Sequence, residues 1–338
     1  MYIKYKFAEW EVQAVRLSSY MYESFAVLGG HDDAVRLLLD LGASGYMEDL
    51  VNAASLGNEV VVRLLLSNHC HNVEHALIRA AANGHEAIVR LLLDEDVTSK
   101  NEALGSAALG GHEAVVRLLL DRGACVDAKV GLRNTPLLCA ARGGHEAVVR
   151  LLLDRGACVD VKSNIGLTPL IEAVWNGHEA AVRLLLERGV CVDAKSEHGD
   201  TPLMWAVRGG REAVVQLLLD RGACVDVRSS LGRTPLIEAI CGEYEAVVRL
   251  LLDHGACVDA QSAVGETPLM WALWGVRKPS KAVVQLLLNH GACVDAKTDD
   301  GETAKDAKQG HSALDLPNGS WAVSPTETTE TGASRMKP

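Results

Sequence analysis

One repeated segment makes up most of the chain, and it is clearest between Gly144 and Lys162, where the sequence is GHEAVVRLLLDRGACVDVK. Its second position recurs at spacings of 27, 27, 27, 33, 33, 33, 33 and 36 residues, at His31, Asn58, His85, His112, His145, His178, Arg211, Tyr244 and Ser280. A regular period constrains the architecture before any single residue is interpreted, because each unit buries its apolar surface only against its neighbours. The sequence therefore predicts a solenoid of stacked repeats.

A single unit indicates why each repeat should form two helices. Thr168 suits an N-cap, and Pro169 suits the first helical position, where its missing N–H costs nothing. This helix should end at Gly177, and a second helix should start at His178. Apolar residues cover most of the second helix, as expected for a helix packed between neighbours on both sides. Gly189 then suits the end of that helix, where a positive φ is common.

Five of the units also contain the tripeptide Thr-Pro-Leu, which begins at Thr135, Thr168, Thr201, Thr234 and Thr267. A 33-residue period with this tripeptide resembles the ankyrin-repeat family, over roughly residues 21 to 315. The resemblance implies an all-α solenoid, in which each unit is a helix–turn–helix followed by a short β-hairpin finger. The chain departs from the family's Thr-Pro-Leu-His, because apolar residues occupy the His position: Leu138, Ile171, Met204, Ile237 and Met270.

The spacing divides the chain into four regions. Residues 1–20 are interpreted as a degenerate N-terminal capping half-repeat, and residues 21–127 as short repeats that lack the finger. Residues 128–316 contain the fingered repeats and a C-terminal cap. Residues 317–338 are rich in Ser, Thr, Pro and Gly, which predicts a disordered tail.

Composition excludes several classes of partner. The net charge is −11 and no basic tract is present, which disfavours nucleic acid as a partner. Charged residues or glycine interrupt every apolar run before it could span a membrane, and the N-terminus lacks the apolar core of a secretory signal. We therefore expect a monomeric intracellular protein, cytoplasmic or nuclear, that acts on protein partners.

Six of the nine cysteines occupy the same repeat position and form what we call the cysteine ladder: Cys125, Cys158, Cys191, Cys224, Cys257 and Cys293. Neighbouring ladder positions should be about 8–10 Å apart, the distance between packed helices. A disulfide needs Cα atoms within about 7 Å, so the ladder should consist of free thiols. We expect these thiols to be mostly buried as small apolar residues. Most of the family has Asp at this position.

The sequence contains no pattern typical of catalysis. It has no nucleophile elbow, phosphate-binding glycine loop or metal motif, so we expect no enzyme activity and no cofactor. The cluster of His69, Cys70, His71 and His75 does not have the spacing of a structural zinc site. The recurring His at the start of second helices indicates a structural hydrogen bond, because repetition is unusual for a catalytic residue.

The family resemblance implies a non-catalytic protein-interaction module that binds its partner through the concave face and the finger tips. Tryptophan and arginine on that face favour binding, since both are enriched in binding hot spots. An alternative is that the tryptophans pack between neighbouring first helices. The candidate binding residues are Asn164, Ile165, Leu167, Trp175, Asn176, Glu197, His198, Trp205, Arg208, Leu231, Arg233, Trp271 and Trp274. A second hypothesis is an adaptor subunit that recruits other machinery through a terminal segment.

The first helices also alternate in sequence. Ile-Glu and Met-Trp alternate in four successive units, at residues 171–172, 204–205, 237–238 and 270–271, which indicates a cassette of 66 residues duplicated in tandem. The alternation has two interpretations. It either records recent duplication alone, or it produces a binding face that presents the same group twice.

Overall fold

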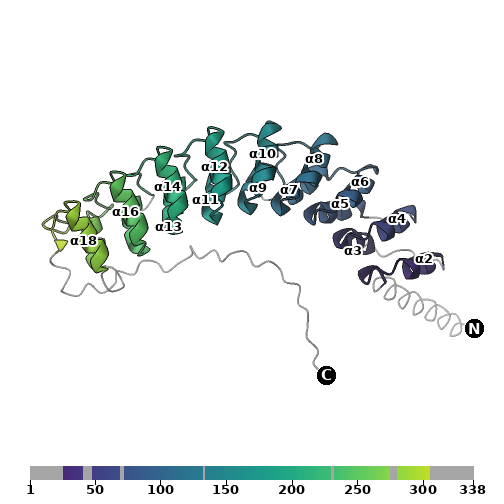
Figure 1. The fold of residues 1–338 in the computed structure, drawn as a ribbon, viewed down its shortest axis with the longest axis horizontal. Helices are drawn as coiled ribbons and strands as arrows, with labels where there is room; N and C mark the ends of the chain where they lie inside the picture. The colour runs from purple at the N-terminus through teal and green to yellow at the C-terminus, as the bar shows by residue number, and fades with distance from the viewer. Residues whose placement is uncertain are drawn as a thin grey trace, which may run out of the picture.

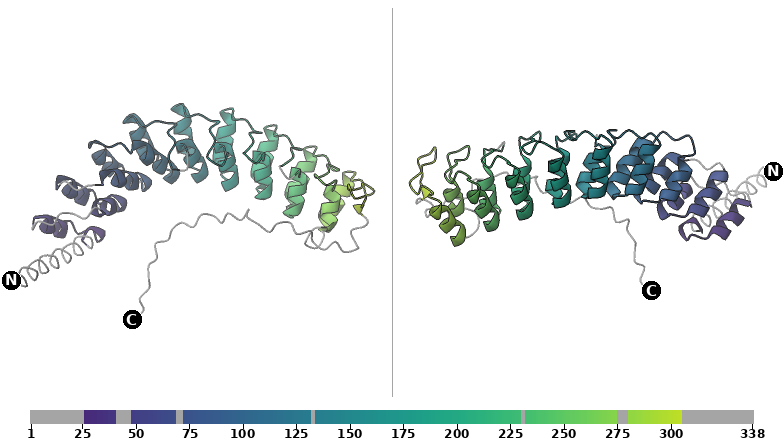
Figure 2. Two further views of the ribbon diagram at one scale, coloured as in Figure 1. Left: turned by 180° about the vertical axis from the view of Figure 1, so that it is seen from behind. Right: turned by 45° about the horizontal axis from the view of Figure 1, so that its top comes forward.

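The computed structural model describes residues 26–40, 48–68, 72–131, 134–229, 232–274 and 280–304. Helix pairs stand side by side along an arc (Figures 1 and 2). The first helices of the pairs are α3 (Asp49–Leu56), α5 (Val73–Ala82), α7 (Lys100–Gly110), α9 (Pro136–Gly143), α11 (Pro169–Asn176), α13 (Pro202–Arg208), α15 (Pro235–Cys241) and α17 (Pro268–Trp274). The second helices are α2 (Asp32–Asp40), α4 (Glu59–Ser67), α6 (Glu86–Leu92), α8 (Glu113–Asp121), α10 (Glu146–Asp154), α12 (Glu179–Glu187), α14 (Glu212–Asp220), α16 (Glu245–Asp253) and α18 (Lys281–Asn289).

The predicted all-α solenoid is confirmed, and its local signals act as expected. Thr168 caps α11, because its hydroxyl accepts a hydrogen bond from the backbone N–H of Ile171 at 3.3 Å. Pro169 begins the helix, and α12 follows directly after His178. Gly189 has φ +77°, the left-handed conformation that glycine adopts without strain. Three predicted segments lie outside the described residues: the N-terminal capping half-repeat at 1–20, the part of the C-terminal cap after residue 304, and the tail at 317–338.

Each repeat buries apolar side chains against both neighbours, so one core runs the length of the arc from Ala26 to Ala304. The apolar residues that replace the family's His are part of this core or adjoin it: Leu138, Ile171, Met204, Ile237 and Met270 are each at most 1% exposed. Burying a side chain of this size removes enough apolar area from water to stabilise the fold by roughly 1.5–3 kcal/mol.

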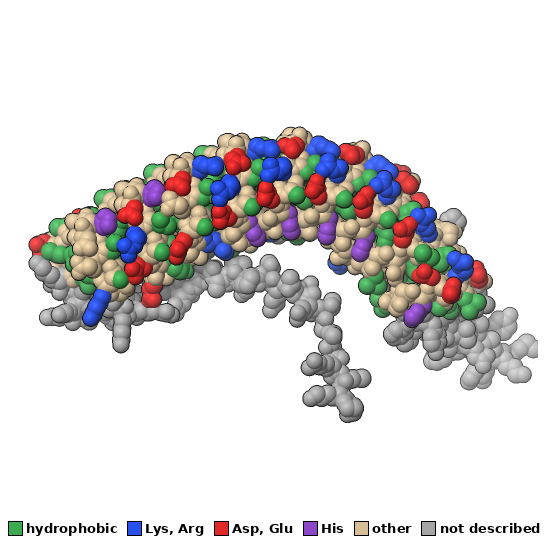
Figure 3. Space-filling view, in the orientation of Figure 1, with side chains coloured by type: hydrophobic (Ala, Val, Ile, Leu, Met, Phe, Trp, Pro, Cys, Tyr) green, Lys and Arg blue, Asp and Glu red, His purple; other side chains and the backbone are tan. Residues whose placement is uncertain are grey.

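From α4 to α16, the residue at the start of each second helix joins its repeat to the preceding one. His145 Nε2 donates to the carbonyl oxygen of Leu109 at 2.8 Å, and His178 Nε2 donates to that of Arg142 at 2.9 Å. Where the sequence departs from His, Arg211 donates to the carbonyl of Trp175 at 2.8 Å instead. Figure 3 shows histidines gathered along the inner edge of the arc. The predicted structural role of these histidines is confirmed.

A glycine lies beneath each of these rings, and this contact gives a matched test. Gly144 has φ +71°, and a Cβ built there would overlap the imidazole of His178. Gly156 has φ +83°, but no atom lies within 4 Å of its would-be Cβ. We expect Gly156→Ala to cost about 1 kcal/mol in backbone strain, and Gly144→Ala to cost about 1–3 kcal/mol more from overpacking. Chemical denaturation of both variants checks this, and equal losses would contradict it.

The predicted β-hairpin fingers are not confirmed, since the described residues contain isolated antiparallel bridges but no strands. Each finger is a tight turn: Ser163 N–H donates to the carbonyl of Leu167 at 2.9 Å, and Gly166 N–H donates to that of Ser163 at 3.1 Å. Because Ser163 and Leu167 are the one backbone pair that joins the two sides of this finger, no ladder between strands can form. In the short repeats only residues 93–99 connect α6 to α7, whereas residues 155–168 connect α10 to α11.

The connection after α6 is held by one carboxylate. Glu74 accepts hydrogen bonds from the backbone N–H groups of Thr98 and Ser99 at 2.8 and 2.7 Å, and from the Thr98 hydroxyl at 3.0 Å. Burial opposes ionisation of Glu74, but the hydrogen bonds from Ser99 and Thr98 outweigh it and lower the pKa to about 2.

The lowered pKa of Glu74 predicts a pH dependence of stability. An acid with a pKa of about 2 when folded and about 4.5 when unfolded stabilises the fold fully above pH 4.5 and loses that contribution between pH 4.5 and pH 2. We expect Glu74→Gln to lower the urea midpoint at pH 7, and the difference from wild type to shrink as the pH falls through this window. Glu86→Gln, which removes an exposed pair with Arg90, is the control. A difference that stays constant with pH would contradict the prediction.

Candidate partner-binding face

Two positions on each first helix, three residues apart, hold the large and polar side chains of this part of the solenoid. We call the exposed sides of the first helices, together with the finger tips, the first-helix face. The first position holds Cys139, Glu172, Trp205, Glu238 and Trp271 in helices α9, α11, α13, α15 and α17. The second position holds Arg142, Trp175, Arg208, Cys241 and Trp274 in the same helices.

At three successive repeat boundaries, the second position of one repeat contacts the first position of the next, and these contacts alternate in kind. The Arg142 guanidinium donates to both carboxylate oxygens of Glu172, at 2.8 and 3.2 Å. One repeat further along, the rings of Trp175 and Trp205 stack with centroids 5.0 Å apart and an interplanar angle of 30°. The next pair is again charged and involves Arg208. The 66-residue alternation therefore pairs complementary side chains across repeat boundaries.

Arg208 is the most heavily bonded side chain on this face. It donates to Asp200 at 2.6 Å and to Glu238 at 3.1 Å, and both carboxylates are buried. Its guanidinium also lies 5.9 Å from the centroid of the Trp205 ring. Burial lowers the pKa of Arg208, but the hydrogen bonds and charges of Asp200 and Glu238 outweigh that effect and raise it. The arginine is held as a fixed cation.

The second cassette departs from the first where Cys241 occupies the position of Trp175. Here Arg233 lies over the ring of Trp271, with 4.6 Å between its guanidinium carbon and the ring centroid. Glu266 lies nearby, and burial raises its pKa, although the Ser262 hydroxyl and the charge of Arg233 act in the opposite direction. Stacking on an indole holds the Arg233 guanidinium in place, a geometry that arginine favours.

The finger-tip candidates differ in exposure. Ile165 is 48% exposed, and Asn164, Glu197 and His198 are also exposed. Leu167 is only 3% exposed, so it is a core residue, and its assignment as a binding residue is wrong. It lies where the tight turn re-enters the repeat, and an apolar side chain there packs inward. Leu231 lies outside the described residues.

The first-helix candidates are placed together on one face. Trp175, Trp205, Trp271 and Trp274 are half-buried, so each contacts its neighbours and still presents surface to solvent. Asn176 is exposed and donates to the carbonyl of Glu172 at 2.8 Å. The interpretation that tryptophans pack between neighbouring first helices holds at Trp175 and Trp205, whose rings stack on each other and keep some exposed surface.

Sequence analysis missed the partners of these residues. Arg142, Glu172 and Glu238 take part in the ion pairs that hold the face together, yet none of these three residues was selected. The signal was present in the alternation itself. An Arg at the second position always precedes a Glu at the first position of the following repeat.

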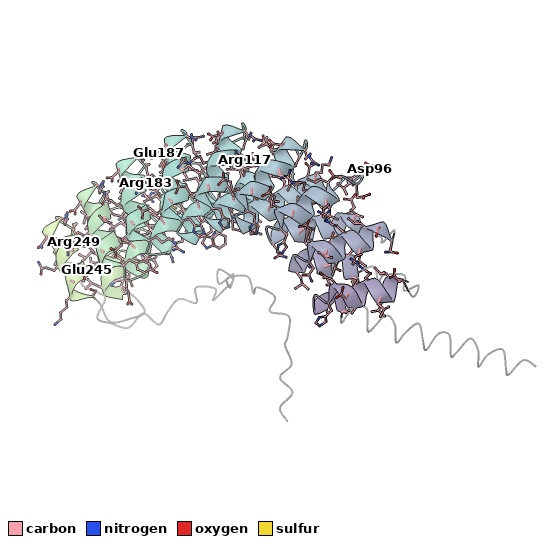
Figure 4. All side chains as sticks on the ribbon, turned by 45° about the vertical axis from the view of Figure 1, so that its right-hand side comes forward. Asp96, Arg117, Arg183, Glu187, Glu245 and Arg249 are labelled. Atoms are coloured by element: carbon pink, nitrogen blue, oxygen red, sulfur yellow. The ribbon has the colours of Figure 1, made fainter. Side chains whose placement is uncertain are left out.

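The second-helix face has a different character, because its charges neutralise one another. Arg183 pairs with Glu179 on the same helix at 2.6 Å, and Arg188 pairs with Asp154 of the preceding repeat at 2.9 Å. Figure 4 labels Arg183 and other members of this outer array. Exposed pairs of this kind contribute about 0–1 kcal/mol each, so they keep the face soluble and neutral more than they stabilise it.

The cysteine ladder is exposed at all six positions, so the expectation of mostly buried thiols is wrong. Its backbone is held instead by polar bonds, such as that from Cys158 N–H to Asp127 Oδ1 at 2.9 Å. In the described part of the chain, no group of three or more His, Cys, Asp or Glu side chains could hold a metal ion. His75 is described, whereas His69, Cys70 and His71 are not.

Comparison with known proteins agrees with this architecture. A family model described as ankyrin repeats in three copies matches residues 50–130, 128–196, 160–229, 190–262 and 224–298. The chain belongs to the ankyrin-repeat family. No curated protein sequence matches it.

Two crystal structures of ankyrin-repeat domains are similar to this ankyrin-repeat chain. The ankyrin repeat domain of human ASB11 is 31% identical with a TM-score of 0.54, over 60% of this chain and 90% of that one. The ankyrin repeat domain of Bcl-3, described as a unique member of the IkappaB protein family, is 31% identical with a TM-score of 0.55, over 60% of this chain and 92% of that one. Ankyrin repeats are a general protein–protein interaction module. Among the described helices, none has the length and apolarity to cross a bilayer.

Proposed function

We propose that this ankyrin-repeat protein binds a partner protein through its first-helix face, with no catalytic role of its own. The observation that supports this most is the array of half-buried aromatic and arginine side chains between Arg142 and Trp274, which is interrupted in α15 by Glu238 and Cys241. Trp and Arg contribute most to binding hot spots because they bury a large area. The array is also fixed in place by its own contacts, which reduces the entropy that binding would cost.

The second-helix face is less suited to binding, which supports the same assignment. Exposed charges there, such as Arg117 with Glu113 and Arg183 with Glu179, are already paired, so a partner would have to displace bonds without gaining apolar contact. Exposed apolar tips such as Ile165 and Val264, at 48% and 56%, extend the first-helix face onto the fingers. The adaptor hypothesis depends on residues 1–20 and 317–338, which lie outside the described residues.

The test is an affinity pull-down from native lysate with matched baits. The first two are wild type and Trp175→Ala/Trp274→Ala, and the control is Arg117→Ala/Arg183→Ala on the second-helix face. All three baits are compared by circular dichroism and thermal unfolding before use. We expect a protein enriched by wild type and by the control but lost with the tryptophan variant. Equal enrichment by all three baits would place the interface elsewhere and reject the proposal.

A further inference from the structure

The cysteine ladder is an exposed row of thiols on the surface of the solenoid. Cys is among the residue types most often fully buried in proteins. Here it is exposed at the same position of six successive repeats: Cys125, Cys158, Cys191, Cys224, Cys257 and Cys293. Its recurrence at this position therefore cannot be explained by packing in the core.

Hydrogen bonds between repeats fix the spacing of the ladder. The backbone N–H of Cys257 donates to Asp226 of the preceding repeat at 3.0 Å, and that of Cys293 donates to Asp259 at 2.9 Å. Each thiol is therefore placed by the stacking of helices, whose axes pack about 8–10 Å apart. Disulfide formation requires Cα atoms within about 7 Å. Neighbouring ladder thiols consequently cannot oxidise one another while the repeats remain stacked.

Two cysteines outside the ladder have a different environment. Burial raises the pKa of the Cys139 thiol to about 11, despite the nearby charge of Arg142. Burial likewise raises the pKa of Cys241 to about 11, because neighbouring side chains desolvate the thiol even though part of the residue is exposed. The thiolate is the nucleophile in disulfide exchange, and at neutral pH a thiol with such a pKa is almost entirely protonated. These two residues serve as internal controls.

We propose that the cysteine ladder is a site of reversible modification by small-molecule disulfides, of which glutathione disulfide is the simplest probe. A ladder thiolate attacks one sulfur of the reagent, a new S–S bond forms to the protein, and the other half leaves as a thiolate. The protein sulfur is oxidised and the leaving sulfur is reduced, so no further oxidant is needed. Because no neighbouring thiol is close enough to displace the adduct, each mixed disulfide persists, and the chain carries from none to six adducts.

This inference goes beyond the proposed partner binding and does not depend on it. The ladder lies directly before the fingers: Cys191 precedes the exposed tip residues Glu197 and His198 in the same connection. Adducts would therefore add bulk and charge beside the finger tips. Because the six thiols react independently, the number of adducts along this edge of the solenoid can vary from none to six.

The experiment uses the full chain carrying Cys70→Ser, since Cys70 lies outside the described residues. The reduced protein is incubated with glutathione disulfide at neutral pH, and adducts are counted by intact mass and located by peptide mapping. We expect up to six adducts, all on the ladder, all reversed by dithiothreitol, and formed at least about tenfold faster than any on Cys139 or Cys241. Ladder thiols that stay unmodified, or that react no faster than Cys139, would overturn the proposal.

Two further measurements sharpen the test. Cys158→Ser should lower the maximum by one adduct and leave modification of the other five unchanged, which distinguishes independent sites from a coupled cluster. Treatment with diamide should produce no intrachain disulfide between consecutive ladder positions. Detection of such a disulfide in folded protein, with an unchanged circular dichroism spectrum, would refute the geometry on which the proposal rests.

Discussion

Deleting residues 200–232 is expected to destabilise the protein by about 3 kcal/mol more than deleting residues 167–199, although both deletions remove one repeat of 33 residues. The first deletion removes Arg208 and leaves Glu238, which is only 9% exposed, opposite Trp175. An unpaired buried charge created in this way costs about 3–5 kcal/mol. The second deletion removes Glu172 together with Trp175 and leaves Arg142 opposite Trp205, where an exposed guanidinium can stack on the ring.

The two deletions are matched in length and in the kind of junction that they create. Both join a positive-φ finger glycine, Gly199 or Gly166, to the residue that precedes a Thr-Pro-Leu helix. Urea unfolding followed by circular dichroism measures the difference. Adding Glu238→Trp to the first deletion should restore most of the loss, because it replaces the orphaned acid by a second indole beside Trp175. Equal stability of the two deletion variants would contradict the importance of the matched side-chain pairs across repeat boundaries.

Leu185→Ala should destabilise the protein by about 2–5 kcal/mol, because Leu185 is fully buried in the middle of the stack and its truncation leaves a cavity. The loss should be local, since each repeat contacts only its neighbours. Hydrogen exchange is therefore expected to increase most in α10, α12 and α14 and little in α4 or α18. Leu186→Ala, at the half-buried position next in sequence, is the control with a smaller expected loss.

A uniform loss of protection along the whole solenoid would be the opposite result. It would mean that the stack unfolds as one cooperative unit, with coupling stronger than contacts between neighbours provide. The measurement requires peptides from both ends of the described region. Unchanged exchange in α12 itself would instead contradict the packing of Leu185.

The fold could be predicted from sequence because its signals are local and repeated. Thr168 and Pro169 mark a helix start, and Gly189 marks a helix end, through effects that involve only a few neighbouring residues. Five copies of such a pattern leave little ambiguity. The role of His178 was predicted for the same reason, since a residue that recurs at every turn has a structural partner.

Two of the failures concern which way a side chain points in a connection. Cys158 and Leu167 lie on either side of one finger. Cys158 was expected to be buried because it is small and apolar, and Leu167 was expected to be exposed because it lies near the finger tip. In the structure Cys158 is exposed and Leu167 is buried. The bonds from Cys158 N–H to Asp127 and from Leu167 N–H to Ser163 set these directions, and neither can be inferred from periodicity.

The candidate site was predicted in part. The tryptophans, Arg208 and Arg233 were selected by residue type and repeat position, and they lie on one face. Their acidic partners were missed, because Glu172 and Glu238 belong to the following repeat, and the alternation by itself does not show which side chains meet across a repeat boundary. Comparing neighbouring units in pairs would have found them.

The alternation of charged and aromatic pairs also determines how many repeats must be duplicated together when such an array lengthens during evolution. Insertion of a single copy would place Trp175 beside an acid or Arg142 beside an indole, whereas insertion of two copies keeps the boundaries between Arg142 and Glu238 matched. Selection for stability would then retain tandem duplications of 66 residues and discard those of 33. The recurrence of Ile-Glu and Met-Trp in strict alternation from 171 to 271 is the record that such a filter would leave.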